Sequence, residues 1–436
     1  MIKQILQKSS WETCDAYDRR VQQSTCGIDR LCTARRAWHA VLMKSSSKYL
    51  HTYQIATLLE NGMSGNDAKK GQDFSFHSIS ASEQDFSRRE VLGLMGGGLG
   101  VAMVGTGLLG SSSSMAQDQS PAAVRQADGG TPRRIDTHQH IVPAKYAEWL
   151  KKRGVTAGGY ATPEWSAEAA IDFMDGAGIE TGILSISTPG VDCSSKSKAR
   201  SWAREMNEYT AGIVSQFPGR FGFFAVLTLP DIKGSIAEAA YALDTLKADG
   251  VVLYSNVRGK YLGDPSWDPL MEELNTRKTV LFEHPSQPCG PGVPGIPAFV
   301  ADFLNDTVRS AINLAKNGCL ERYPDLKIIL SHGGGYAPYA AERLAYACSQ
   351  DGSIESGVKR LRQFYYDTAL SSTPFSLPSL LAFADPTRIT FGSDFPYASK
   401  ANATLMTAQL DAYAMSDEQR QLINRGNAEI LFPRLS

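Results

Sequence analysis

The sequence predicts an α/β fold of the (β/α)₈ or TIM-barrel class over residues 133–436, preceded by an export signal and a disordered N-terminal tail. Three observations predict the barrel. Short apolar runs alternate with longer amphipathic segments from residue 133 onward, which is the pattern of βαβ units in a parallel sheet. Eight such runs occur, and eight is the strand number of this barrel. No GxGxxG motif follows the first run, which removes the usual reason to prefer a doubly wound open sheet.

The predicted strands are rich in β-branched and aromatic residues, as a parallel sheet buried on both faces requires. They span residues 135–142, 181–187, 221–227, 250–254, 279–284, 327–332, 364–368 and 388–393. Amphipathic helices are predicted between them at 166–177, 199–217, 235–247, 265–277 and 299–316. In the first of these, Ala169, Ala170, Phe173 and Met174 share one face, and Ser166 is a suitable N-cap.

Composition bounds the class of protein. Hydrophobic residues make up 42% of the 436 residues and charged residues 20%, which is ordinary for a globular domain with a large core. The formal net charge is -1, and no basic run with interleaved aromatics occurs after the first 132 residues, so a nucleic-acid partner is not expected. The seven cysteines form no CxxC pair, and free thiols are the expectation.

Residues 87–116 resemble a twin-arginine export signal. Arg88 and Arg89 precede a charge-free segment over 91–114, and Ser114-Met115-Ala116 offers the small residues that a signal peptidase reads. The alternative is a membrane-spanning helix over 91–110, but eight glycines there lower hydrophobicity and helix propensity. The signal predicts a periplasmic or exported protein with no stable membrane insertion after cleavage.

The remaining N-terminal segments show no sign of a packed domain. Residues 1–86 have no long amphipathic period, so we expect either a disordered tail or a tail that is not translated because initiation occurs at Met63. Residues 117–132 are rich in Ala, Asp, Gln and Gly and are expected to form a flexible linker.

Five polar residues fall at predicted strand ends, where the catalytic groups of a barrel lie. His138 and His140 are two apart on the first strand, so both imidazoles point to one face. His284, His332 and Asp394 end or follow the fifth, sixth and eighth strands. A lone histidine on an apolar strand is more often a core residue, and a lone aspartate more often a helix or turn cap. The coincidence of all five favours a site for Zn²⁺ or a similar divalent ion.

This arrangement resembles the amidohydrolase superfamily. Similarity is most specific to the branch of aminocarboxymuconate-semialdehyde decarboxylase and 6-methylsalicylate decarboxylase. It is carried by the segment 220–285 and by the motifs Leu330-Ser331-His332-Gly333-Gly334-Gly335 and Gly392-Ser393-Asp394-Phe395-Pro396. The resemblance covers roughly residues 133–433 and none of the first 117.

The resemblance implies roles for each residue. His138, His140 and His284 would bind the metal, and Asp394 would bind it and also carry a proton. His332 would be the acid/base or substrate-orienting histidine beside the ligands. The predicted fourth strand, 250–254, lacks the lysine that bridges two metals in binuclear members. One divalent ion is therefore expected, Zn²⁺ first and Mn²⁺ as the alternative.

The expected activity is metal-dependent non-oxidative decarboxylation of a small aromatic or unsaturated carboxylic acid. The rival enzymatic activity is hydrolysis of a lactone, ester or amide by a metal-activated water. An exported metal- or solute-binding protein is the non-enzymatic alternative. The resemblance also suggests a homodimer. An arginine is expected to hold the substrate carboxylate. The candidates are Arg200, Arg204, Arg258 and Arg309.

A Pro/Gly-rich loop over 285–297 directly follows His284. It is interpreted either as a lid over the metal or as a plain connector. Cys289 in this loop and Cys193 after the second strand are expected near the site as surface thiols rather than ligands.

Overall fold

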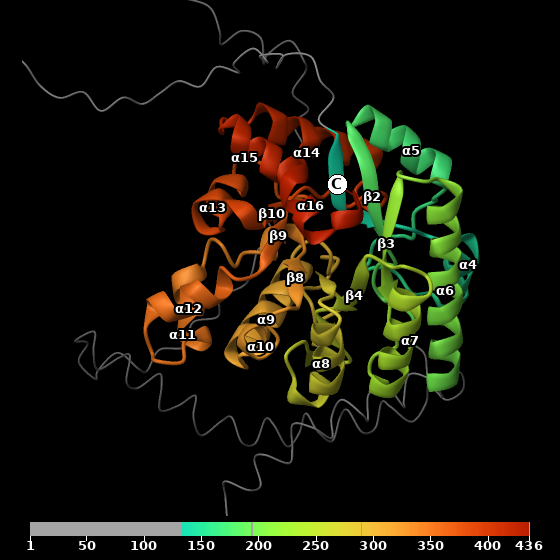
Figure 1. The fold of residues 1–436 in the computed structure, drawn as a ribbon, viewed down its shortest axis with the longest axis horizontal. Helices are drawn as coiled ribbons and strands as arrows, with labels where there is room; N and C mark the ends of the chain where they lie inside the picture. Colours follow the sequence, from blue (N-terminus) through green and yellow to red (C-terminus); the bar gives the residue numbers. More distant parts are fainter. Residues whose placement is uncertain (1–132, 193–194, 289, 436) are drawn as a thin grey trace, which may run out of the picture. The chain divides into compact units, whose positions relative to one another are not determined.

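Eight parallel strands form a single sheet in the computed structural model, which describes residues 133–192, 195–288 and 290–435 (Figure 1). The strands follow the order β1-β2-β3-β4-β7-β8-β9-β10, and every neighbouring pair is parallel. They are β1 (Arg134–His140), β2 (Ile179–Ser185), β3 (Phe221–Val226), β4 (Gly250–Tyr254), β7 (Val280–His284), β8 (Lys327–Leu330), β9 (Tyr365–Asp367) and β10 (Ile389–Thr390).

Backbone hydrogen bonds between β1 and the segment after β10 close the sheet into a barrel. Thr137 N donates to Phe391 O over 2.9 Å, Asp394 N to His138 O over 2.8 Å, and His140 N to Phe395 O over 2.8 Å. The predicted (β/α)₈ barrel with eight strands is thus confirmed.

The strand ends differ from the prediction by a few residues, most of all in β10. It stops at Thr390 instead of residue 393 because the next amides find other partners. Phe391 N donates to Ile423 O over 2.9 Å, and Ser393 N donates to the Asp136 carboxylate over 3.1 Å. These bonds turn the chain across the mouth of the barrel and bring residue 394 over it.

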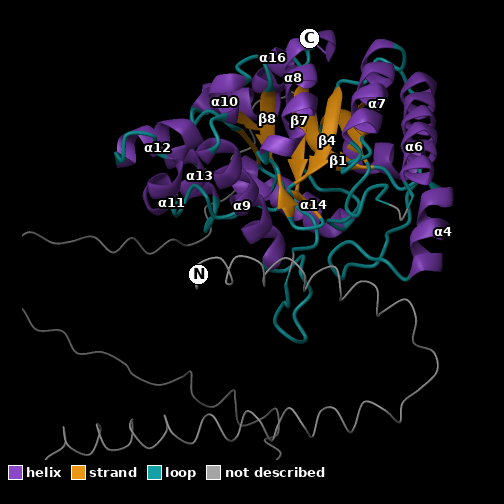
Figure 2. Cartoon of the chain, turned by 90° about the horizontal axis from the view of Figure 1, so that it is seen from below, coloured by secondary structure: helices purple, strands orange, loops and turns teal. Residues whose placement is uncertain are grey.

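Helices surround the strands (Figure 2). The five predicted helices are all present, shifted by up to three residues at either end, and Ser166 caps the first by accepting from Ala169 N over 3.1 Å. The α-helices are α4 (Ala144–Arg153), α5 (Ala167–Gly176), α6 (Lys196–Gln216), α7 (Ile232–Asp244), α8 (Asp268–Thr276), α9 (Asp302–Lys316), α10 (Cys319–Arg322), α11 (Ala341–Cys348), α12 (Ile354–Leu361), α13 (Leu377–Phe383), α14 (Lys400–Ala412), α15 (Asp417–Gln421) and α16 (Asn427–Leu431).

Short elements complete the described fold. The 3₁₀ turns are η2 (Pro265–Trp267), η3 (His332–Gly334), η4 (Pro386–Arg388) and η6 (Pro433–Leu435), and η5 (Leu422–Gly426) is a π-helical turn. A two-stranded antiparallel hairpin, β5 (Asn256–Val257) with β6 (Lys260–Tyr261), follows β4.

Buried aromatic rings fill the barrel beneath its carboxyl-terminal end. Phe224 and Phe282 stack with their centroids 5.3 Å apart, and Phe282 also meets the His138 ring at 4.8 Å. Close packing of this kind fixes the side chains above it. The polar residues at the strand ends therefore pack against closely packed apolar side chains inside the barrel.

The predicted tail, export signal and linker lie outside the described residues, as do Cys193 and Cys289. Of the described cysteines, Cys319 and Cys348 are buried free thiols, as expected. Within the described part of the chain, no helix has the length and hydropathy that a membrane crossing requires.

Candidate metal centre

His138 and His140 meet inside the barrel at the end of β1. Both side chains are fully buried, and their Nε2 atoms lie 3.2 Å apart. This is the geometry that their spacing of two on a strand predicts. His284, at the end of β7, packs against both rings, with its ring centroid 5.4 Å from that of His138 and 4.9 Å from that of His140.

The Nδ1 atoms of these three rings have partners outside the centre. His138 Nδ1 lies 2.6 Å from Asp367 Oδ2, and His284 Nδ1 donates to Pro285 O over 2.8 Å. Ser185 Oγ donates to the backbone, so it accepts from His140 Nδ1 over 2.9 Å. A proton on each Nδ1 leaves the Nε2 lone pair facing the shared centre, as ligating histidines require.

Asp394 completes the cluster from the segment that follows β10. Its Oδ1 lies 3.3 Å from His138 Nε2 and 3.1 Å from His140 Nε2, and its Oδ2 lies 3.4 Å from His332 Nε2. The backbone of Asp394 has a φ of 59°, and that of His332 has a φ of 52°. Non-glycine residues rarely adopt this left-handed conformation, and it concentrates at functional sites.

His332 differs from the other three histidines. It follows β8 in a turn where Gly333, Gly334 and Gly335 all have positive φ, a conformation that side chains disfavour. Its buried Nδ1 has no hydrogen-bond partner among the described residues. Among the described residues, Asp394 is therefore the one hydrogen-bond partner of the His332 ring, which also packs against the rings of His138 and His284.

The pKa values of the site residues indicate which side chains are charged and which are neutral. Burial would raise the pKa of Asp394, but hydrogen bonds from His138, His140 and His332 outweigh it and hold the pKa well below its usual value. Burial lowers the pKa of His140, and burial with neighbouring imidazoles lowers the pKa of His284 well below its ordinary value. Burial also opposes a charge on His138, but Asp367 and Asp394 raise its pKa to about 10. The site thus holds an ionised carboxylate beside two neutral imidazoles.

The donor set fits a divalent cation. Ligand atoms of His138, His284, His332 and Asp394 all lie within 4.8 Å of one another. His140 adjoins this group, because its Nε2 lies 3.1 Å from Asp394 Oδ1. Imidazole nitrogens with one carboxylate suit Zn²⁺ and Mn²⁺ alike. All five predicted site residues come together. The group of four within 4.8 Å includes His332 and not His140, whereas the Nδ1 partners single out His138, His140 and His284.

A cavity of about 360 Å³ opens above this cluster. His284, His332 and Asp394 form its polar end. Its walls are mainly apolar or aromatic and include Tyr160, Phe299, Phe303, Leu370 and Tyr397. Such a volume and lining suit a small ligand with one ring.

None of the four candidate arginines lines this cavity in the described part of the chain. Arg200 pairs with Asp231 over 2.7 Å, and Arg204 with Glu238 over 3.0 Å. Arg258 pairs with Asp192 and Arg309 contacts Tyr261. The polar end of the cavity is therefore built by the histidines and Asp394.

The sequence analysis did not identify three buried carboxylates near the site, of which Asp367 and Asp136 contact His138 and Asp306 lies on α9. Asp367 orients His138, and Asp136 accepts from His138 N and from Ser393 N and Oγ. Burial raises the pKa of Asp136 to about 7. Asp367 lies next to the end of the predicted strand 364–368 and is the last residue of β9, so the signal used for Asp394 could have found it. Asp136 lies within β1 and gave no such signal.

Asp306 on α9 joins the loops that follow β4 and β7. It accepts from Ser255 Oγ, from Asn256 Nδ2 over 2.9 Å, from Tyr261 Oη over 2.7 Å and from Ser286 N over 3.1 Å. Ser286 lies two residues after His284, so Asp306 helps to fix the start of the 285–297 loop. Residues 290–297 of that loop are exposed.

Comparison with known proteins gives a consistent result. The family model described as amidohydrolase matches residues 135–434. A decarboxylase of Aspergillus niger is 38% identical over 322 residues, covering 69% of this chain and 88% of that protein. The 6-methylsalicylic acid decarboxylase of Penicillium expansum is 37% identical over 314 residues, covering 69% and 97%. These relatives bear out the prediction of a carboxy-lyase of the amidohydrolase superfamily.

Solved structures agree with the fold. A crystal structure described as an amidohydrolase II has a TM-score of 0.65 at 29% identity, covering 69% of this chain and 99% of its own. The 5-carboxyvanillate decarboxylase of Novosphingobium aromaticivorans, solved with manganese, has a TM-score of 0.61 at 22% identity, covering 69% and 96%. From residue 135 to residue 434, this chain belongs to the amidohydrolase family.

Proposed function

We propose that the barrel catalyses the metal-dependent, non-oxidative decarboxylation of a small aromatic carboxylic acid. The observation that carries the proposal is the meeting of four histidines and Asp394 at the polar end of an aromatic-walled cavity. The relatives named as decarboxylases at 37% and 38% identity support the same reaction.

The metal would be held by His138, His140, His284 and Asp394. The hydrogen-bond partners of the three Nδ1 atoms support this set, because ligating histidines almost always donate their second ring N–H. A bound divalent ion would act as a Lewis acid toward the oxygens of the acid. We propose Zn²⁺, and the manganese in a solved member of the fold keeps Mn²⁺ as the alternative.

His332 and Asp394 would move the proton. Decarboxylation breaks the bond between the ring carbon and the carboxyl carbon, leaves the electron pair on the ring carbon and requires a proton there. Asp394 Oδ2 and His332 Nε2, 3.4 Å apart, face the cavity in which the ring would lie. The ionised Asp394 accepts from His332 Nε2, so this nitrogen carries a proton, and Nδ1 has no partner among the described residues. Such positioned proton transfer contributes about 10²–10⁴-fold to a rate.

The cavity walls would select and orient the ring. Phe299, Phe303 and Leu370 offer apolar surface for the face of the ring, and Ser371 and Asn402 offer hydrogen bonds to a ring hydroxyl. With no arginine lining the cavity in the described residues, the acid's own oxygens would meet the metal end. This favours an aromatic acid with a hydroxyl next to the carboxylate, because both groups can then reach one ion.

The test is carbon dioxide release by the purified full-length chain loaded with Zn²⁺ or Mn²⁺. The panel would contain 6-methylsalicylate, 2,6-dihydroxybenzoate and 5-carboxyvanillate. Release should disappear in His332→Ala and in Asp394→Ala and persist in Glu342→Gln, which changes an exposed carboxylate on α11. A metal-loaded protein that releases no carbon dioxide but opens lactones or esters would replace this proposal with the hydrolase alternative.

A further inference from the structure

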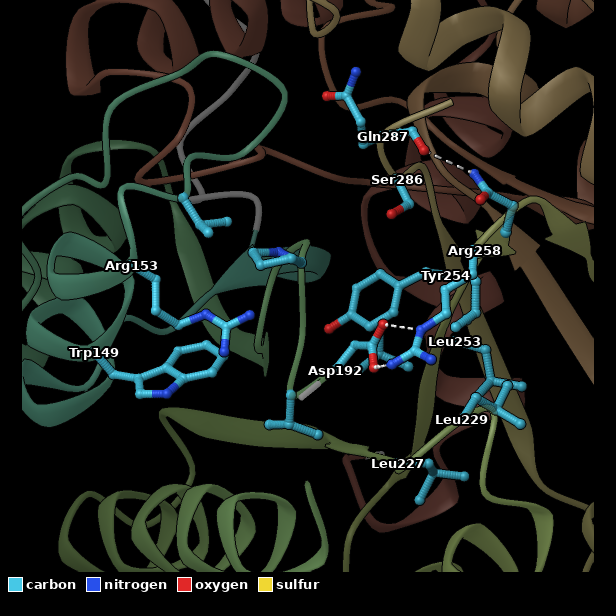
Figure 3. A pocket seen from close by; sticks show the side chains of 16 residues that line it. Trp149, Arg153, Asp192, Leu227, Leu229, Leu253, Tyr254, Arg258, Ser286 and Gln287 are labelled. Carbon is cyan, nitrogen blue, oxygen red and sulfur yellow. Dashed lines mark hydrogen bonds and ion pairs between the residues drawn. The ribbon is translucent and has the colours of Figure 1, made fainter. Parts of the chain in front are cut away.

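A second cavity of about 280 Å³ is formed partly by loops that also form the metal-site cavity, and Figure 3 shows the side chains that line it. The same loops serve both. The loop after β2 places Ser187 in the metal-site cavity and Pro189 in the second one. Likewise, His284 at the end of β7 lines the metal-site cavity, and Ser286 just after it lines the second one. This second cavity therefore also opens at the carboxyl-terminal ends of the strands.

Tyr254 contacts the loop that serves both cavities, and no described residue lines both of them. Its ring lines the second cavity, and its Oη donates to Ile186 O over 2.8 Å. Gly190, with a φ of 66°, lets the backbone pass the ring, since a Cβ there would lie 2.3 Å from a ring carbon. A ligand in the second cavity would thus not touch the metal ligands.

The second cavity has an apolar wall and a cationic side. Figure 3 shows Leu227, Leu229 and Leu253 on one side, with Trp149 and Arg153 across the cavity from them. The Arg153 guanidinium lies 4.7 Å from the centroid of the Trp149 ring. Its flat face is thus supported by the indole, while its N–H groups remain available at the edge.

The charges of the lining leave an excess of one positive charge, from two arginines and one aspartate. Arg258 already pairs with Asp192, its Nη2 2.7 Å from Oδ1 and its Nε 2.9 Å from Oδ2. Arg153 pairs with no carboxylate among the described residues, and its one described interaction is the contact with Trp149. The single aspartate is occupied, so a metal cation has no carboxylate here to bind.

We propose that this second cavity binds a small organic carboxylate with an apolar body. The carboxylate would accept two parallel hydrogen bonds from Arg153, the geometry that a guanidinium offers to such a group. The apolar body would lie between Trp149 and the three leucines. The volume is near the lower limit for ligand pockets, about 300 Å³, which fits a single ring or a short branched chain.

The probe is 3-phenylpropanoate, titrated by calorimetry into the full-length, zinc-loaded protein. It has a carboxylate and an apolar ring but no hydroxyl beside the carboxylate. We expect Arg153→Gln to weaken its binding by about tenfold or more, since charge-assisted hydrogen bonds contribute about 1.5–3 kcal/mol. Arg343→Gln, which changes an exposed arginine on α11, and His332→Gln, in the metal-site cavity, should leave the affinity unchanged.

A second readout identifies the cavity directly. A nitro-substituted 3-phenylpropanoate should quench the fluorescence of Trp149 on binding. Trp149→Phe should keep the affinity and lose that quenching, which a misfolded variant would not do. Unchanged affinity in Arg153→Gln, loss of binding in His332→Gln, or no binding at millimolar probe would each overturn the proposal.

Discussion

The Asp367→Asn substitution tests whether the carboxylate behind His138 governs metal affinity. Asp367 Oδ2 lies 2.6 Å from His138 Nδ1, and both side chains are fully buried. The amide has almost the same size, but it removes the negative charge that keeps a proton on Nδ1 and strengthens Nε2 as a donor. Loss of such a partner weakens metal binding by about 10–100-fold, or about 1.4–2.8 kcal/mol. The assay is competition for Zn²⁺ against a chromophoric chelator at neutral pH.

A matched control separates this effect from general loss of stability. Asp231 is also a buried aspartate with a hydrogen-bonded partner, Arg200, but it directly precedes α7 and has no hydrogen bond or ion pair with a described histidine. Asp231→Asn should lower the free energy of unfolding without changing zinc affinity. If Asp367→Asn binds zinc as tightly as the natural protein, or if both variants lose affinity equally, the orienting role of Asp367 is refuted.

Three further predictions concern stability, pH and export. Asp306→Ala should lower the free energy of unfolding in urea by at least about 3 kcal/mol, because each buried donor left without an acceptor costs about 1–3 kcal/mol; an unchanged transition midpoint would contradict the network. Metal-free protein should lose stability as pH rises from about 6.5 to about 10, because the pKa of His138 is higher in the folded protein than in the unfolded chain. The protonated His138 stabilises the fold fully below about pH 6.5, and this stabilisation is lost as pH rises to about 10. Melting temperatures across that range, with and without zinc, test this, since bound metal should flatten the slope. If the twin-arginine signal directs export, replacing both Arg88 and Arg89 by lysine should leave the protein in the cytoplasm by cell fractionation, and a variant that still reaches the periplasm would refute the twin-arginine route.

Local patterns in the sequence were enough to predict the barrel and the cluster. Strand and helix periods do not depend on distant partners, so counting them gave the eight strands. His138 and His140 share a face because of their spacing alone. His284, His332 and Asp394 could be added because every strand of a parallel barrel ends at the same rim.

Contacts between distant segments could not be predicted in the same way. The bond from His138 to Asp367 joins residues 229 positions apart, and nothing near either residue specifies it. The same holds for the second cavity, where Arg153 ends a helix while Leu229 and Leu253 belong to two different strand-loop units. Each looks like an ordinary surface or core residue alone, and only the closed barrel brings them to one cavity.

The three imidazoles proposed as ligands differ in what orients them, and this decides where the site can be tuned. His284 depends on a backbone carbonyl, which no side-chain substitution removes. His140 depends on Ser185, whose backbone oxygen also lies within 3.3 Å of Nδ1 and can take over if the hydroxyl is lost. His138 depends on the Asp367 side chain alone for its Nδ1 partner. A change of residue 367 therefore removes the charge behind one proposed ligand, so we expect Asp367→Asn to weaken metal binding more than Ser185→Ala does.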